Sequence, residues 1–195
     1  MKNKSEGTLQ GISISHWQRY VNFAQIKKRG IKVVYIKATE GTFYIDPTLT
    51  RNYTDARAEG LLVGFYHCLR PIDEADAVDQ AKHFISTISD INYDCKLALN
   101  LEFEDTVEKY LLNKISEIFL KEIKKLTGED AIICTTTNFA KKNLNTSLSK
   151  YPLWIVDFQK EVPDENFIWD DWVGFQYSNS EMIDGVSGNG EMSFF

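Results

Sequence analysis

Strand-like and helix-like patterns alternate along the first 150 residues, and this alternation constrains the fold more than any other feature of the sequence. The strand-like stretches are short and rich in apolar residues, and they lie at 11–15, 31–38, 61–69, 96–102 and 131–137. Each is followed by a more polar segment with helical character, at 22–30, 46–60, 73–88, 107–128 and 138–150. Strands that alternate with helices predict a parallel sheet.

The last third of the chain has a different pattern. Strand-like stretches at 153–158, 172–178 and 191–195 are joined by turn-rich segments without helical periodicity. The sequence therefore predicts an α/β fold: a single irregular TIM-like barrel of about five β/α units followed by three strands without helices. A doubly wound open sheet is the alternative, but neither GxGxxG nor GxxxxGK[ST] is present to bind a nucleotide on it.

Length favours one protein domain, and net charge argues against two classes of partner. A chain of 195 residues suits one domain, and we expect a polar tail at 1–10 and a single barrel domain at 11–195. The net charge of −6 argues against binding to nucleic acid or to an anionic membrane. We expect a monomer.

The cysteines and the first residues bear on the compartment. The three cysteines, Cys68, Cys95 and Cys134, lie inside or beside apolar strand-like stretches and form no CxxC pair, which indicates reduced thiols. The polar start MKNKSEGTLQ has no apolar core of a signal peptide, and no stretch is long enough to insert in a membrane. We therefore expect synthesis in the cytoplasm, with any target outside the membrane reached after release.

Polar residues gather where the strands of the predicted barrel end. Active sites on such barrels lie at the carboxyl ends of the strands. Alternation places Ser13 inward on the first strand, Lys37 on the second and Asn100 with Glu102 on the fourth. In the stretch 61–69 we interpret Val63, Phe65 and His67 as the inward face. This arrangement predicts a cleft for a polar polymer.

Glu102 is the strongest candidate for chemistry. It ends the stretch CKLALNLE at 95–102, which is mostly apolar. Burying a carboxylate in such a place costs free energy unless the group has a partner or a catalytic function. Glu104 could reach back as a second carboxylate, but strand direction argues against it. Together with Asp105 it is expected near the amino end of the helix 107–128, where negative charge is favourable.

Other candidates have structural interpretations of equal or greater weight. His67 could be a buried core histidine, Lys37 could extend its amine to solvent, and Glu40 could simply begin the turn at Gly41. Tryptophan side chains more often pack in a core than serve as platforms for sugars. On this basis we assign packing roles to Trp17, Trp154 and Trp172 taken singly.

The residues carry a resemblance to a known family. The matching text is GISISHWQ, VVYIKATEGTFYIDPTLTRNY, AEGLLVGFYHCLRP, NYDCKLALNLE, YPLWIVDF and VGFQYSNSEMIDGVSGN. These stretches cover nearly the whole chain and resemble the lysozymes of glycoside hydrolase family 25, most closely clostridial cell-wall lysozymes and the catalytic domains of phage endolysins.

The resemblance implies a fold and an activity. The family fold is an irregular barrel of five β/α units followed by three strands, which agrees with the pattern above. Its members are muramidases that cleave the β-1,4 bond between N-acetylmuramic acid and N-acetylglucosamine in peptidoglycan. The implied partner is the glycan strand, and no metal or cofactor is implied. Glu102 matches the family's general acid.

Four positions depart from the family pattern. Ser13 and Asn100 stand where the family has Asp, Glu191 stands where it has Asp, and Cys134 stands where it usually has Tyr. The substitutions gather at the site and spare the scaffold. Because two carboxylates become neutral, we expect reduced turnover, and the alternative is a catalytically inactive domain that binds peptidoglycan. Under either hypothesis the resemblance points to a set of glycan-binding residues: Lys37, Glu40, Tyr66, His67, Arg70, Trp154, Asp157, Gln176 and Tyr177.

Overall fold

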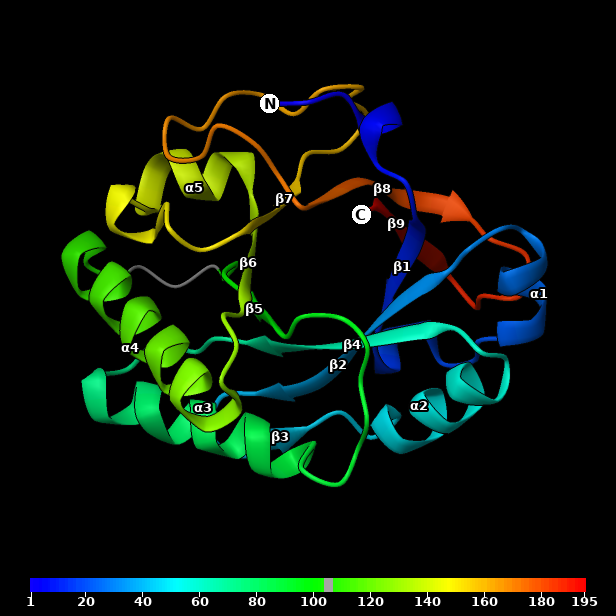
Figure 1. Cartoon of the computed structure of the whole chain (residues 1–195), viewed down its shortest axis with the longest axis horizontal. Coiled ribbons are helices and arrows are strands. Elements are labelled where there is room, and N and C mark those ends of the chain that lie inside the picture. The colour runs from blue at the N-terminus through cyan, green and yellow to red at the C-terminus, as the bar shows by residue number, and fades with distance from the viewer. Residues whose placement is uncertain (104–106) are drawn as a thin grey trace.

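The chain folds into a closed barrel in a computed structural model that describes residues 1–103 and 107–195 (Figure 1). Within these residues eight strands form the ring: β1 (Gln10–Ile14), β2 (Val33–Glu40), β4 (Leu62–Cys68), β5 (Ala98–Asn100), β6 (Ile132–Thr136), β7 (Leu153–Val156), β8 (Gly174–Met182) and β9 (Asn189–Phe194). The short β3 (Tyr44–Ile45) extends the end of β2 outside the ring. The ring closes because β1 pairs with both β2 and β9.

The predicted order of five β/α units followed by three strands is confirmed. The helices are α1 (Phe23–Lys28), α2 (Leu49–Ala58), α3 (Glu74–Thr87), α4 (Lys109–Thr127) and α5 (Thr137–Asn143), with single 3₁₀ turns η1 (Lys4–Glu6), η2 (His16–Gln18) and η3 (Thr146–Leu148). Neighbouring strands run parallel from β1 through β2, β4, β5, β6 and β7 to β8. Only β9, within the ring described, is antiparallel to both of its neighbours.

The helices begin and end at residues suited to those positions. The side chains of Asp73, Glu108 and Thr136 accept hydrogen bonds from backbone N–H groups in the first turns of α3, α4 and α5. Gly128 ends α4 with a φ of 81°, a left-handed conformation that glycine adopts without strain. Of the helices described, none is long and apolar enough to cross a membrane.

Two apolar cores lie on the two faces of the sheet. The larger core fills the layer between the strands and the surrounding helices, and the smaller one lies inside the barrel around Tyr35 and Trp154. Three inward glycines make room for the aromatic rings there. A Cβ on Gly64 would lie 2.5 Å from the Tyr35 ring, and one on Gly174 or Gly11 would lie 2.7 Å from the ring of Phe195.

The inward face predicted for β4 is wrong. Val63, Phe65 and His67 pack outward against the helices, and Tyr66 points into the barrel with Gly64 and Cys68. The strand is apolar on both of its faces, as parallel strands commonly are, so alternation in its sequence carries no information about which face is which.

The first residues lie against the barrel. The indole of Trp172 donates to the carbonyl oxygen of Lys2, and the backbone N–H groups of Thr8 and Leu9 both donate to the carbonyl oxygen of Phe195. β1 begins at Gln10, one residue before the predicted domain boundary. The division into a tail at 1–10 and a barrel at 11–195 stays a prediction.

Truncation tests the closure of the barrel. A fragment of residues 1–170 lacks β8 and β9, so β1 loses its antiparallel partner and the interior opens to water. We expect no cooperative thermal transition in this fragment by circular dichroism or calorimetry. The matched fragment 8–195 lacks only the first residues and keeps every strand, and it should melt cooperatively at a reduced temperature. Cooperative melting of fragment 1–170 would contradict a closed barrel.

Candidate functional site

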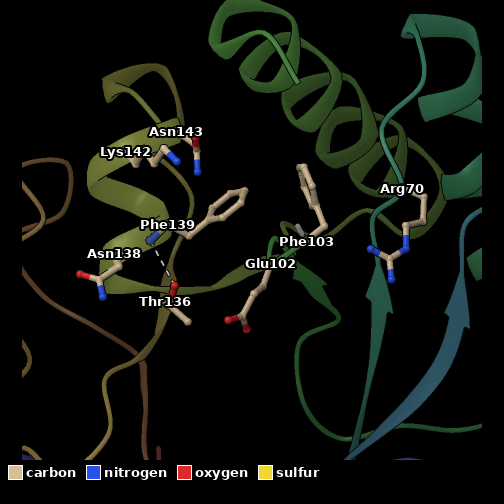
Figure 2. Close-up of a pocket in the computed structure, with 8 residues that line it drawn as sticks. All are labelled: Arg70, Glu102, Phe103, Thr136, Asn138, Phe139, Lys142 and Asn143. Atoms are coloured by element: carbon tan, nitrogen blue, oxygen red, sulfur yellow. Dashed lines mark hydrogen bonds between the residues drawn. The ribbon is translucent and has the colours of Figure 1, made fainter. Parts of the chain in front are cut away.

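Two hollows meet at the carboxyl ends of the parallel strands. The first, of about 820 Å³, lies between β5 and α5 and is shown in Figure 2. The second, of about 620 Å³, lies on the other side, beside the turn between β2 and β3. Glu102 and Arg70 line both hollows, so the hollows form one groove with these two side chains at the junction. A groove of this size accommodates several sugar units of a polymer.

Glu102 lies at the junction, two residues beyond the end of β5. Partial burial and the nearby carboxyl of Glu191 raise the pKa of Glu102 above its ordinary value. In Figure 2 its carboxyl group points into the open space below Phe103 and Phe139. A carboxyl that keeps its proton to higher pH and faces a groove is suited to act as a general acid.

Glu191 provides a second carboxyl group inside the same end of the barrel. It lies on β9 directly opposite Ser13 on β1, and the Ser13 hydroxyl donates to its Oε2 over 2.7 Å. The same hydroxyl lies 3.3 Å from Oε1 of the buried Gln176. Burial raises the pKa of Glu191, and the hydrogen bond from Ser13 partly opposes this rise. Both carboxyls therefore keep their protons to higher pH than an ordinary glutamate, and the hydrogen bond from Ser13 favours the charged form of Glu191.

Asn100 lies between two thiols. The strand register places Cys68 of β4 and Cys134 of β6 beside it, one on each side. Burial raises the pKa of Cys68 to about 11 and that of Cys134 well above its ordinary value, so both are neutral thiols at neutral pH. All three cysteines are free; Cys134 is buried, whereas Cys68 and Cys95 are half-buried. Position 100 therefore holds a neutral amide with neutral neighbours.

Lys37, Glu40 and Arg70 form an ion-pair cluster at the floor of the second hollow. Lys37 Nζ lies 2.5 Å from one carboxylate oxygen of Glu40, and Arg70 Nε lies 2.7 Å from the other. Although burial pushes the pKa of Glu40 upward, its hydrogen bonds to Lys37 and Arg70 lower it overall. Glu40 is therefore an ionised structural partner and is not available to share the role of Glu102.

Exposed aromatic rings line the rim of the second hollow. Trp17 is 75% exposed and Phe43 is 93% exposed, although both are large and apolar. Beside Trp17, the ring of His16 is held by Asp46, whose Oδ2 lies 2.9 Å from Nδ1, and by the hydroxyl of Tyr44 at 3.0 Å. Large rings that stay exposed at a groove are suited to stack on the apolar faces of sugars.

His67 is a core residue, and its assignment to the groove is wrong. It is fully buried behind β4, stacked on Phe119 with ring centroids 4.9 Å apart. Its two ring nitrogens are hydrogen-bonded to Thr39 and Gln80. Burial lowers the pKa of His67 to about 4, so it is neutral at neutral pH. The alternative interpretation of His67 as a satisfied core histidine is confirmed.

Three further residues predicted to bind glycan lie elsewhere. Trp154 is 1% exposed and fills the barrel interior, with its indole donating to the hydroxyl of Ser193. Asp157 accepts hydrogen bonds from the Thr137 hydroxyl and the backbone N–H of Asp164, so it fixes a loop. Tyr177 stacks on Phe194 on the outer side of the sheet. None of the three lines either hollow, because the hollows are lined by inward side chains at the ends of strands, by the loops that follow and by α5.

The remaining predicted residues are brought together at one end of the barrel. They share an inward position or a place at the groove: Ser13, Lys37, Glu40, Tyr66, Arg70, Asn100, Glu102, Gln176 and Glu191. Tyr66 packs among the inner core residues beneath the groove. The expectations for Glu104 and Asp105 lie outside the described residues.

The aromatic rim and the wall formed by α5 are not predicted from the sequence. Phe43, Tyr44 and Ile45 form a short apolar run within the segment TFYIDP, outside the predicted strands, and that break in pattern was a usable signal. Trp17 was assigned to packing, but it stands exposed. Lys142 and Asn143 lie on the face of α5 that borders the first hollow, as Figure 2 shows, and their sequence has no distinguishing feature.

The described part of the chain contains no cluster of side chains arranged as metal ligands. Residues 1–103 and 107–195 contain no group of three or more His, Cys, Asp or Glu side chains placed to hold a metal ion. What the site does contain is a pair of electrostatically coupled carboxyls, a neutral amide and a groove on both sides of the acid. This arrangement can donate a proton to a bound polymer and stabilise positive charge that develops next to the broken bond.

Solved structures share this fold. A bacterial lysozyme from Streptomyces coelicolor superposes with a TM-score of 0.85 at 28% identity, covering 96% of this chain and 91% of that one. A family 25 glycosyl hydrolase from Bacillus anthracis gives a TM-score of 0.88 at 18% identity, covering 100% of this chain and 91% of that one, and this likeness concerns the fold alone.

Curated relatives agree with the structural comparison. An autolytic lysozyme from Clostridium acetobutylicum is 38% identical over 199 residues, which cover 96% of this chain and 56% of that lysozyme. Lysozyme M1 from Streptomyces globisporus is 30% identical over 203 residues, which cover 96% of this chain and 67% of that protein. The chain thus spans little more than half of the first relative and two thirds of the second.

A family profile settles the classification. Residues 12–186 match the profile of the glycosyl hydrolases of family 25, which is nearly the whole chain from β1 to the turn before β9. The match agrees with the motifs, the closed barrel and the position of Glu102 at the end of β5, and it confirms the resemblance seen in the sequence. This chain belongs to the glycosyl hydrolases of family 25.

Proposed function

We propose that this chain hydrolyses the β-1,4 bond between N-acetylmuramic acid and N-acetylglucosamine in bacterial peptidoglycan. The observation that carries the proposal is the position of Glu102, a carboxyl of raised pKa at the junction of two open hollows. Membership of family 25 and the likeness to an autolytic lysozyme support the substrate class.

The described residues divide the work of the reaction. Glu102 protonates the oxygen of the leaving sugar, because burial and Glu191 keep its proton in place. Glu191 supplies negative charge to the positive transition state, and Ser13 orients it by donating to its carboxylate. Asn100 has no charge to offer, but its amide can hydrogen-bond to the acetamido group of a bound sugar.

Reduced turnover is the second part of the proposal. Ser13 and Asn100 replace two carboxylates implied by the family pattern, so one negative partner remains among the described residues around Glu102. The loss of one electrostatic partner in an active site commonly slows catalysis by ~10²-fold or more. Losses within one catalytic unit do not add, so the longer side chain of Glu191 can retain part of the rate.

The same substitutions favour a second candidate function. If the neutral groups at positions 13 and 100 abolish turnover, the groove and its exposed aromatic rim still suit the binding of glycan strands. The chain would then act as a binding domain on a lysozyme fold. Under both functions we propose that it acts as a monomer at the bacterial cell wall, after release from the cytoplasm.

Removal of the acid tests the primary proposal. Glu102→Gln should abolish the release of reducing sugars from purified peptidoglycan, because an amide has no proton to donate to the leaving oxygen. The control Glu129→Gln changes an exposed carboxylate far along the chain and should keep the wild-type rate. Full activity in Glu102→Gln would show that the acid is wrongly assigned. Binding of glycan by a wild type that releases no sugar would select the second function.

The same variant predicts a change in stability. The raised pKa of Glu102 means that the folded chain holds a proton that the unfolded chain releases as the pH rises, so its carboxyl weakens folding above that range. Glu102→Gln should therefore melt at a higher temperature than the wild type at pH 7. At pH 3, where the carboxyl is protonated in both states, the difference should nearly vanish. An equal difference at both pH values would contradict the assigned shift.

The pH profile tests the role of Glu191. Activity requires protonated Glu102, so it falls as the pH rises through the pKa of that group. Glu191→Gln removes a nearby negative charge and should lower this pKa. The basic limb of kcat/KM should therefore move to lower pH, and the maximal rate should fall by about 10²-fold. An unchanged limb together with an unchanged rate would remove Glu191 from the mechanism.

Restoring the family carboxylates tests the cause of slow turnover. The double variant Ser13→Asp, Asn100→Asp should release reducing sugars at least about tenfold faster than the wild type, a gain that corresponds to ~1.4 kcal/mol. It should also melt at a lower temperature, because the new charges lie close to Glu191 and Glu102. A folded double variant with no gain in rate would show that the neutral groups do not limit turnover.

A further inference from the structure

The two hollows of the groove differ in chemistry, although both border Glu102. The second hollow presents the exposed rings of Trp17 and Phe43. The first hollow presents an amine and an amide, from Lys142 and Asn143 of α5, and its aromatic side chains, Phe103 and Phe139, pack edge to face against each other. Rings that are free to stack suit sugars, whereas exposed polar groups suit a charged, hydrogen-bonding ligand.

Lys142 places a positive charge at the wall of the first hollow. No ion pair of its amine is found among residues 1–103 and 107–195, whereas the other cation of this hollow, Arg70, is already paired with Glu40. A solvent-exposed amine at the wall of a groove can pair with an anionic group of a ligand. The chain as a whole carries a net charge of −6, so this local positive charge is not part of a general basic surface.

The wall that carries Lys142 is fixed at both ends. At its start, the Thr136 hydroxyl accepts a hydrogen bond from the backbone N–H of Phe139, shown as a dashed line in Figure 2. At its end, the buried side chain of Asn113 donates to the carbonyl oxygen of Asn143 over 2.9 Å and accepts from the backbone N–H of Asn145. A binding surface on a fixed element loses little entropy when a ligand arrives.

We propose that the first hollow binds the stem peptide of peptidoglycan, with the Lys142 amine paired to a peptide carboxylate and the Asn143 amide beside it. This inference rests on the proposed function, in which the muramic acid sugar lies next to Glu102. Its lactyl group carries a short peptide with free carboxylates, and the hollow of about 820 Å³ is far larger than a lactyl group requires. The glycan itself then continues along the aromatic rim of the second hollow.

Binding of two defined fragments tests the inference without requiring turnover. One is the disaccharide-tripeptide obtained by complete muramidase digestion, and the other is the same disaccharide with the peptide removed, which retains a lactyl carboxylate. Neither contains a bond that the chain could cleave. By titration calorimetry, the wild type should bind the peptide-bearing fragment more tightly, and this preference should shrink at high salt.

Charge reversal identifies the contact. Lys142→Glu should weaken binding of the peptide-bearing fragment by about three- to tenfold and leave the peptide-free fragment unchanged. Lys141→Glu is the matched control, because it makes the same change at the neighbouring exposed position of the same helix. Equal effects of the two variants, or an equal loss for both fragments, would overturn the inference.

The outcomes separate this inference from the proposed function. A wild type that cleaves peptidoglycan but binds both fragments equally would refute the peptide site and leave the hydrolase. If the lactyl carboxylate were the partner of Lys142, the variant would weaken the peptide-free fragment, in which that carboxylate is free, and this outcome also refutes the peptide site. A wild type that shows the Lys142-dependent preference but releases no reducing sugar would retain the peptide site and refute the hydrolase. Absence of both binding and cleavage would refute both.

Discussion

β1 holds the barrel closed, because it pairs parallel with β2 on one side and antiparallel with β9 on the other. Closure creates an interior that has to be filled, and one end is filled by the rings of Tyr35, Trp154 and Phe195 against inward glycines. The opposite end is left for polar side chains. The position of the groove is therefore a consequence of how the interior is packed.

Electrostatics at the open end depends on the same closure. Ser13 and Glu191 are neighbours only because β1 and β9 pair, and their hydrogen bond fixes the carboxylate that raises the pKa of Glu102. Glu40, in contrast, is ionised, and its negative charge is balanced by ion pairs with Lys37 and Arg70. One end of the barrel thus contains a carboxyl whose pKa is raised by burial and by a neighbouring carboxyl, and that neighbour accepts a hydrogen bond from a hydroxyl.

The sequence predicted the order of elements well because each kind of element has its own period and its own end signals. It failed where burial on both faces removes the period: His67 and Tyr66 are adjacent on a strand apolar on both sides, and only the structure shows which points inward. The predictions for Trp154 and Trp17 were wrong for another reason. A tryptophan in sequence looks the same whether it fills a barrel or stands exposed at a groove, and three-dimensional neighbours decide between the two. Alternation placed Ser13 and Asn100 on the inward face, and the resemblance to the family singled them out, together with Glu191, as positions of the site.

The hydrogen bond between Ser13 and Glu191 joins residues 178 positions apart in the sequence. During synthesis β1 leaves the ribosome long before β9 exists, so this hydrogen bond cannot form until β9 has been translated. Contacts of such long range are also made late in folding, since the closure of a long loop has to precede them. The open end of the barrel is therefore complete only after translation of β9, and a chain that ends before β9 lacks the hydrogen bond between Ser13 and Glu191.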